Sequence, residues 1–258
     1  MKTGDDSILY ILFDYSYSDT FFYASELPML NWSLVTNERD IQKSYLKIFY
    51  MTLHIPKLLS SIPVFYHDSI KTFDSKKLFV EYIIKYDMSQ YIPMTYYSDP
   101  LKFPWIIKPI YGIGGDNTII FTTDDEYNLS PIKYNNNFLI QDYILSTQQN
   151  VAHVLCNRGK IVHSIVYIES IQEKYYIKRG RVKNYSKRFL TENELTIFCK
   201  IMNSTCYHGI CSIDYVYDQN NELKIFEINP RMGGSLFFDK TDFTIFIKCI
   251  DKYSIIYT

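Results

Sequence analysis

The chain has 258 residues, a length that fits one large domain or two to three small ones. Hydrophobic residues make up 47%, enough for a substantial core, and the net charge of −1 gives no electrostatic basis for non-specific nucleic-acid binding. No apolar run is long enough to span a membrane, and residues 1–6 lack the pattern of a secretion signal, so we expect a cytoplasmic protein.

The first third of the chain carries few clear signals. Residues 7–13 are apolar and predict a buried opening strand, and residues 61–66 suggest a second one. Residues 74–86 predict a helix, because apolar side chains recur on one face and Asp74 can cap its first turn.

Strand signals dominate from residue 103 onward. A helix is predicted over 191–207, where apolar residues repeat every three or four positions. Hairpins mixed with helices favour an α+β fold class. The predicted strands are 105–108, 118–121, 137–145, 151–156 and 160–168, with a hairpin turn at 157–160.

The five cysteines form no Cys-x-x-Cys pair, so we expect reduced thiols that lie mostly in the core. A catalytic thiol is the alternative interpretation.

Two runs near the C-terminus, 210–217 and 223–228, are rich in Ile, Val, Tyr and Phe and predict a β-hairpin. The turn sequence Asp218-Gln219-Asn220-Asn221 separates them. If Tyr217 pairs with Glu222, then Asp214 faces Ile225. Asp214 and Glu227 are then diagonal neighbours, roughly 7–8 Å apart at the backbone.

Three oxygen-bearing side chains converge on one face of this hairpin. Side chains alternate along a strand, so Glu227 and Asn229 share the face that carries Asp214. Two carboxylates and an amide oxygen suit a hard cation such as Mg²⁺. The alternative interpretation is a solvated surface strand.

A glycine-rich loop follows the predicted strand that ends at Lys108. Gly112, Gly114 and Gly115 would let backbone N–H groups approach phosphate oxygens, and Lys108 would add a positive charge. The loop is neither a Walker A loop nor a dinucleotide fingerprint, because no helix pattern follows it. An ordinary glycine-rich hairpin turn is the alternative.

With these motifs the chain resembles the ATP-grasp superfamily, which includes carbamoyl phosphate synthetase, biotin carboxylase, D-alanine–D-alanine ligase and many carboxylate–amine ligases. The specific match is Ile213-Asp214-Tyr215 followed by Phe226-Glu227-Ile228-Asn229-Pro230-Arg231. The resemblance implies an ATP-grasp fold over residues 74–258, with two α/β subdomains that clamp ATP. The implied bounds are 1–73 for a short N-terminal α/β segment, 74–140 for a small lid subdomain and 141–258 for a metal-binding subdomain.

The resemblance also implies roles for residues. Lys77 is preferred over Lys76 as a second phosphate lysine, and Gln149 or Gln148 stands where the family has a ribose-binding glutamate. Asp142 replaces the usual hinge glutamate. The implied ATP-binding residues are Lys77, Lys108, Gly112, Gly114, Gly115, Gln141, Asp142, Tyr143, Ile144 and Gln149, and the implied ligands of Mg²⁺ or Mn²⁺ are Asp214, Glu227 and Asn229.

The implied reaction activates a carboxylate with ATP as an acyl phosphate and couples it to an amine. Arg231 and Lys108 are the implied catalytic residues, and Arg179, Gly233 and Ser235 are implied to bind substrate. The expected partners are small-molecule or peptide carboxylates and amines, with a homodimer by analogy. A kinase-like or carboxylase-like enzyme and a degenerate nucleotide-binding module without turnover are the alternatives.

Other basic residues and histidines are open to two interpretations. The stretch that holds Lys178, Arg179 and Arg181 could close over a substrate or form a solvated loop. His208 could act as a general base or pack in a turn, and the strand positions of His153 and His163 favour structural roles.

Overall fold

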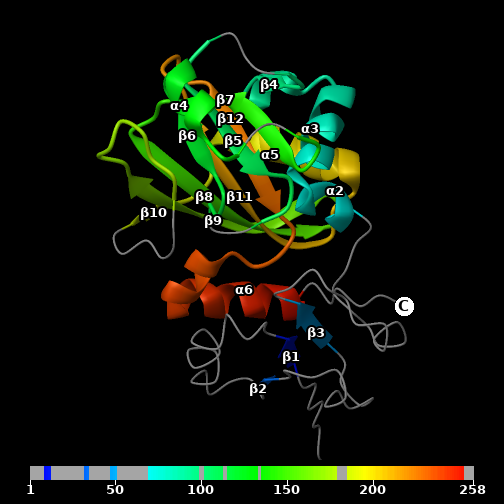
Figure 1. Ribbon diagram of the computed structural model, residues 1–258. Helices are drawn as coiled ribbons and strands as arrows, with labels where there is room; N and C mark the ends of the chain where they lie inside the picture. Colours follow the sequence, from blue (N-terminus) through cyan, green and yellow to red (C-terminus); the bar gives the residue numbers. More distant parts are fainter. Residues whose placement is uncertain are drawn as a thin grey trace, which may run out of the picture.

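The computed structural model describes residues 9–12, 32–34, 47–50, 69–98, 102–112, 115–132, 135–178 and 185–252. Its strands form three sheets of three, four and five strands, which follow one another along the chain (Figure 1). The strand predicted at residues 61–66 lies outside the described residues. In the part of the chain that is described, no helix is long and apolar enough to cross a membrane.

The N-terminal sheet is parallel, with strand order β2-β1-β3. Its strands are β1 (Leu9–Leu12), β2 (Trp32–Leu34) and β3 (Lys47–Tyr50). The strand predicted within residues 7–13 is confirmed by β1. The partners of β1 are short and far along the chain, so local periodicity did not reveal them.

The four-stranded sheet is antiparallel, with order β4-β7-β5-β6. Its small core gathers around Trp105, whose ring centroid lies 4.7 Å from Phe121 and 4.9 Å from Tyr127. The elements are β4 (Thr95–Tyr96), β5 (Trp105–Pro109), β6 (Ile119–Phe121), helix α4 (Asp124–Leu129) and β7 (Phe138–Asp142).

The five-stranded sheet is also antiparallel, with order β10-β9-β8-β11-β12. Its strands are β8 (Gln148–Asn157), β9 (Lys160–Ser170), β10 (Ser186–Arg188), β11 (Gly209–Tyr217) and β12 (Leu223–Asn229). The predicted turn after β8 is confirmed. Gly159 is required there, because its φ is +85° and a Cβ would lie 2.9 Å from the Asn203 Cα.

One face of the five-stranded sheet carries the main core. Helices α2 (Ile70–Asp74), α3 (Lys76–Lys85) and α5 (Glu192–Thr205) pack on this face. Fully burying a large apolar side chain such as Phe198 of α5 contributes about 1.5–3 kcal/mol. Thr191 and Glu194 form a capping box that begins α5 close to the predicted position.

Helix α3 differs from its prediction in two respects. Its cap is Ser75, whose hydroxyl accepts a hydrogen bond from the Leu78 N–H, whereas the predicted cap Asp74 is the last residue of α2. Phe79 and Ile83 of α3 belong to the core of the five-stranded sheet. The helix therefore packs with the larger subdomain, although the predicted bounds 74–140 grouped it with the smaller one.

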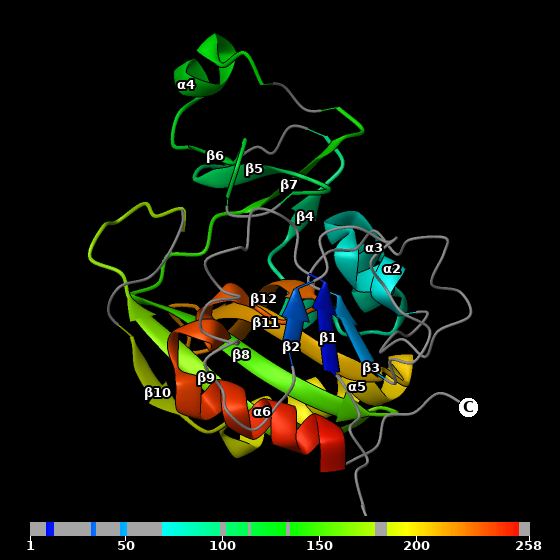
Figure 2. The ribbon, with the colours of Figure 1, turned by 90° about the horizontal axis from the view of Figure 1, so that it is seen from below.

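The other face of the five-stranded sheet faces helix α6 (Lys240–Lys252) and a cavity. In Figure 1, α6 lies between the N-terminal sheet and the five-stranded sheet, and Figure 2 shows the four-stranded sheet as a separate layer.

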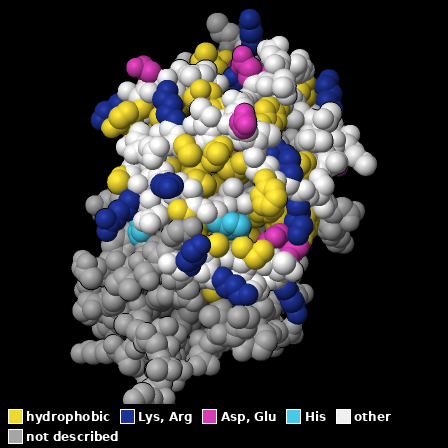
Figure 3. Space-filling model, turned by 180° about the vertical axis from the view of Figure 1, so that it is seen from behind, with side chains coloured by type: hydrophobic (Ala, Val, Ile, Leu, Met, Phe, Trp, Pro, Cys, Tyr) yellow, Lys and Arg dark blue, Asp and Glu magenta, His cyan; other side chains and the backbone are white. Residues whose placement is uncertain are grey.

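Basic side chains are dispersed over the described part of the face in Figure 3 and form no continuous patch. The apolar stripe of α6 consists of Phe243, Phe246, Ile247 and Ile250, which repeat at helical spacing in the sequence.

Candidate functional site

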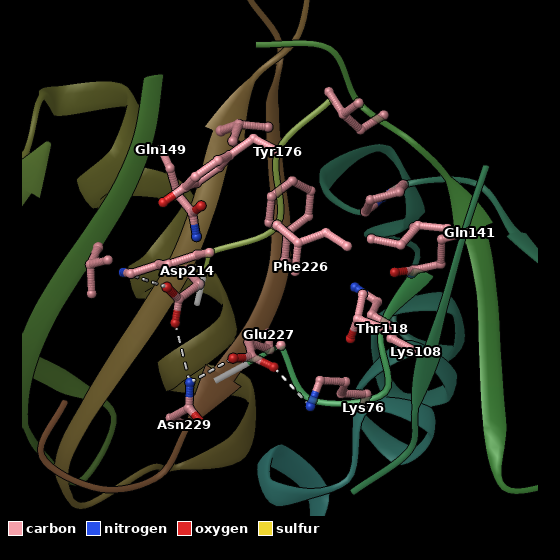
Figure 4. A pocket seen from close by; sticks show the side chains of 18 of the residues that line it. Lys76, Lys108, Thr118, Gln141, Gln149, Tyr176, Asp214, Phe226, Glu227 and Asn229 are labelled. Atoms are coloured by element: carbon pink, nitrogen blue, oxygen red, sulfur yellow. Dashed lines mark hydrogen bonds and ion pairs between the residues drawn. The ribbon is translucent and has the colours of Figure 1, made fainter. Parts of the chain in front are cut away.

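A cavity of about 540 Å³ lies between the four-stranded and five-stranded sheets (Figure 4). This volume is typical of ligand-binding pockets. Gly114 and Arg179 lie outside the described residues, and Lys77 is not among the lining residues. The predicted residues that do line the cavity are Lys108, Gly112, Gly115, Gln141, Asp142, Tyr143, Ile144, Gln149, Asp214, Glu227, Asn229, Arg231, Gly233 and Ser235.

The carboxylate hairpin forms as predicted but in a different register. Asp214 is directly opposite Glu227, not diagonal to it. Tyr217 pairs with Leu223 instead of Glu222, and the pairing shifts by one further residue between Asp214 and Tyr215. Such a bulge places two residues of one strand opposite one residue of its partner. Phe226 and Glu227 therefore both line the cavity, and strict alternation would have sent Phe226 to the opposite face.

The Asn229 amide links the two carboxylates. Its Nδ2 donates to Asp214 Oδ2 at 3.2 Å and to Glu227 Oε1 at 3.1 Å. Lys76 Nζ lies 2.9 Å from Glu227 Oε2, and Lys178 Nζ lies 3.8 Å from Asp214 Oδ1. Nitrogen donors thus surround the carboxylate oxygens. A bound cation could take the place of these donors and neutralise the same negative charge.

The pKa values of the two carboxyl groups are shifted in opposite directions. Burial raises the pKa of Asp214, and the nearby Glu227 charge adds to this effect. Burial alone would also raise the pKa of Glu227, but the Lys76 charge and the Asn229 hydrogen bond lower it below its usual range. Glu227 is therefore the residue of the pair that holds negative charge most readily.

Two lysines approach the carboxylate hairpin from other elements. Lys108, at the end of β5, is buried, and its Nζ lies 5.3 Å from the centroid of the Phe226 ring, within cation–π range. Burial lowers the pKa of Lys108 to about 8, although the Glu227 charge opposes this shift. Lys76 lines the cavity, whereas Lys77, the preferred candidate for a second phosphate lysine, is not among the lining residues.

The glycine loop is tied to this lysine. The Gly112 carbonyl accepts a hydrogen bond from Lys76 Nζ at 3.1 Å, and the backbone at Gly112 has a φ of +153°. Gly115 has a φ of +74°, a conformation that strongly favours glycine. These two positions explain why the loop that follows Lys108 needs glycine.

Residues Gln141 to Ile144, which the resemblance implies bind ATP, line part of the cavity. The Thr95 hydroxyl donates to the Pro93 carbonyl, so it can only accept from Gln141, whose Nε2 lies 2.9 Å away. Gln141 Oε1 is then directed elsewhere, and it is buried without a hydrogen-bond partner among the described residues. A ligand that brings an N–H group to this acceptor would satisfy it.

Tyrosines form the wall beside the predicted ribose residue. Gln149 is buried in the cavity lining, whereas Gln148 is exposed. Tyr176 donates through its hydroxyl to Glu169 Oε1 at 2.8 Å and through its N–H to the Tyr143 hydroxyl at 2.7 Å. No sequence signal indicated that Tyr176 would reach the cavity, because it lies in an irregular segment.

Cys156 and Cys211 are buried, Cys199 and Cys249 are partly buried and Cys206 is exposed, so the expectation of thiols mostly in the core holds for two of the five. His208 Nδ1 accepts a hydrogen bond from the Arg158 N–H in the turn after β8, which agrees with a packing role. Burial raises the thiol pKa values of Cys156 and Cys211, so neither is a reactive thiolate. Lys178 lines the cavity, and Arg181 lies outside the described residues.

Comparison with known families identifies the fold. A model of the ATP-grasp domain matches residues 76–235, more than half of the chain. The chain belongs to the ATP-grasp family. Among curated proteins, an uncharacterized protein of Mycoplasma genitalium, MG012, is 20% identical over 132 residues, which is 51% of this chain and 45% of that protein. The chain thus spans less than half the length of this curated relative.

Solved ATP-grasp structures have the same fold. D-cycloserine synthetase DcsG aligns with a TM-score of 0.65 at 9% identity, covering 95% of this chain and 99% of that one. D-alanine–D-alanine ligase from Bacillus anthracis aligns with a TM-score of 0.62 at 14% identity, covering 96% and 97%. N5-carboxyaminoimidazole ribonucleotide synthetase from Thermotoga maritima aligns with a TM-score of 0.58 at 13% identity, covering 88% and 69%. At such low identities these likenesses show the fold alone, and they confirm the predicted α+β ATP-grasp class.

Proposed function

We propose that the protein is an ATP-dependent ligase that activates a carboxylate as an acyl phosphate and couples it to an amine. One observation carries this proposal: Lys76 and Lys108 meet the Asp214, Glu227 and Asn229 side chains in a single cavity. Two cations beside an oxygen-rich metal site suit a nucleoside triphosphate. Neighbouring folds whose names describe synthetases and ligases, including an L-amino acid ligase from Bacillus licheniformis, support the class of reaction.

The donor set of the hairpin fits a hard divalent cation. Asp214 and Glu227 supply carboxylate oxygens, and Asn229 can supply Oδ1 if its side-chain amide flips. These residues would hold Mg²⁺ or Mn²⁺, which when bound supplies positive charge against the phosphate oxygens. The amide nitrogen of Asn229 contacts both carboxylates here, and this convergence supports a cation held between them.

The remaining residues bind and orient the nucleotide. Lys108 and Lys76 neutralise phosphate oxygens, and Gly112 and Gly115 allow the backbone to approach them. The Gln141–Ile144 segment takes the base, and Gln149 faces the ribose. An amide bonds a ribose hydroxyl more weakly than the carboxylate usual in the family.

Chemistry then needs positioning and charge neutralisation more than a protein nucleophile. A substrate carboxylate oxygen attacks the γ-phosphorus, the bond to the β-phosphate oxygen breaks, and ADP leaves. An amine then attacks the acyl carbon, releases phosphate and loses a proton. Arg231 lines the cavity two residues after Asn229, and we assign it to the charge on the transferred phosphoryl group.

The test is release of ADP from Mg-ATP in the presence of pooled amino acids. Wild-type protein is expected to release ADP faster when the pool is present, and Asp214→Ala or Glu227→Ala is expected to abolish this turnover. The matched control is Glu222→Ala, because Glu222 is an exposed carboxylate at the turn of the same hairpin. Unchanged turnover in either cavity variant would refute the metal assignment.

A nucleotide-binding module without turnover is the second candidate. The presence of Gln149 in place of a ribose-binding acid favours it. Tight Mg-ATP binding without ADP release under any substrate pool would support this candidate over the ligase.

A further inference from the structure

His153 is buried on the face of β8 that points toward the cavity. It pairs in register with Ser212 of β11, and the segment around Gly233 covers it. A Cβ on Gly233 would lie 2.6 Å from His153 Cε1 and 2.9 Å from Ser212 Oγ, so the backbone touches the imidazole directly. The ring is fully buried and contacts Tyr167 and Phe246 edge-on, at centroid distances of 5.2 and 6.5 Å.

The two ring nitrogens of His153 have different surroundings. Nε2 lies 2.8 Å from Ser235 Oγ, whereas Nδ1 is buried and has no hydrogen-bond partner among the described residues. Burial lowers the pKa of His153 to about 3, so the ring is neutral and carries one proton. Among backbone groups, a buried N–H without an acceptor is rarer than a buried carbonyl without a donor, and we take the imidazole to follow the same preference. The proton therefore belongs on Nε2, and Nδ1 keeps a bare lone pair.

This tautomer determines what Ser235 can do. Nε2–H donates to Ser235 Oγ, so the serine hydrogen is not used by the imidazole. Within the described part of the chain, the hydroxyl makes no hydrogen bond other than the one to His153. Ser235 lines the cavity, and its O–H is thus available as a donor to a ligand there. In the opposite tautomer, Nε2 would accept the hydrogen of the Ser235 hydroxyl. The serine would then offer only oxygen lone pairs to the cavity, which would suit an ammonium group instead.

We propose that His153 is a positioning residue: it holds Ser235, which the family resemblance implies is a substrate-binding residue, as a donor to an anionic carboxylate or phosphoryl oxygen of the substrate. Arg231 lines the same cavity and supplies a cationic group for such an oxygen, whereas Lys178, which also lines it, lies 3.8 Å from Asp214 Oδ1. The inference rests on the proposed function, because it assigns one contact of the group that is activated or transferred.

The tautomer is measured directly by long-range ¹H–¹⁵N NMR on the full chain with ¹⁵N-labelled histidine. His153→Phe and His163→Gln variants assign the signals. The expected result is a neutral ring protonated at Nε2. A ring protonated at Nδ1, or a charged ring at neutral pH, overturns the proposal whether or not the protein turns over ATP.

Anion binding is measured by calorimetric titration of orthophosphate, alone and with saturating Mg-ADP. Ser235→Ala is expected to weaken orthophosphate binding by about 10-fold or more, the effect of losing one hydrogen bond to a charged group, while Mg-ADP affinity stays unchanged. Ser235→Thr, which keeps a hydroxyl, is expected to retain most of the affinity. Equal orthophosphate affinity in wild type and Ser235→Ala, or no binding by wild type, overturns the proposal.

The control for His153→Phe is His163→Gln. His163 also contacts Phe246, at 4.6 Å between centroids, but it does not line the cavity. His153→Phe is expected to weaken orthophosphate binding and His163→Gln to leave it unchanged. Equal weakening in both variants would assign the effect to core packing and overturn the positioning role. Failure of wild type to bind Mg-ADP would instead contradict the proposed function, and the tautomer measurement would still stand.

Discussion

Replacing Glu194 with alanine is expected to lower the free energy of unfolding by about 3–5 kcal/mol, the usual cost of breaking a buried ion pair. The Glu194 side chain is fully buried in α5, and both of its oxygens accept hydrogen bonds from Arg188 at 2.6 Å. It also accepts from the hydroxyls of Tyr215 and Tyr217 and from the Thr191 N–H. Alanine leaves the buried Tyr215 hydroxyl and the partly buried Arg188 without their acceptor, and each lost partner of this kind costs about 1–3 kcal/mol.

The assay is urea denaturation monitored by circular dichroism. The matched control is Glu192→Ala, because Glu192 lies in the same first turn of α5 but is exposed. It is expected to change the free energy of unfolding by no more than about 0.5 kcal/mol. A double variant, Glu194→Leu with Arg188→Met, is expected to regain part of the loss, because apolar replacement removes both unpaired charges. If Glu194→Ala costs no more than Glu192→Ala, the structural argument is wrong.

The same carboxylate makes stability depend on pH. Burial alone would raise the pKa of Glu194, but Arg188 and Tyr215 lower it from 4.5 to about 2 in the folded state. A group with a depressed folded pKa stabilises the protein above its unfolded pKa and loses that contribution as the pH falls. The difference in unfolding free energy between wild type and Glu194→Ala should therefore shrink from about pH 4.5 to about pH 2. A difference that stays constant over this interval would contradict the assigned pKa.

Two further predictions concern the cavity. Lys76→Met is expected to weaken Mg-ATP binding by about 10-fold or more, because it removes a charged contact, whereas Lys77→Met is expected to change the dissociation constant by less than about twofold. Equal weakening of Mg-ATP binding by the two substitutions in calorimetric titrations would contradict the assignment of Lys76. Gln141→Leu is expected to reduce the preference for ATP over ITP by about 2–10-fold, because Gln141 Oε1 accepts from an amino group but repels the 6-oxo group of hypoxanthine. An unchanged ATP-to-ITP ratio of dissociation constants would show that Gln141 does not read the base.

The carboxylate hairpin shows how far local patterns reach. The strands, the turn at residues 218–221 and the shared face of Asp214, Glu227 and Asn229 follow from alternation and turn chemistry, and the structure has them. The bulge beside Asp214 was not predicted. It depends on how both strands twist against the rest of the sheet, so it leaves no mark in the local sequence.

The choice between Lys76 and Lys77 shows the same limit of local sequence patterns. Lys76 and Lys77 are adjacent in the sequence, and a helix rotates by about 100° between neighbours, so only one can face the cavity. The cap at Ser75 sets the start of α3, and this rotation brings Lys76 to Glu227. The preference for Lys77 came from the family resemblance, which does not fix the rotation of the helix.

The sequence by itself determined the family, the fold class and 14 of the residues that line the cavity, because those depend on short motifs and on the periods of strand and helix. Tertiary structure decided the register of the hairpin, the lysine that enters the cavity, the packing of α3 on the larger sheet and the meeting of His153 with Ser235, 82 residues apart. These features depend on contacts between segments far apart in the chain, and local patterning carries no information about which distant side chains will meet.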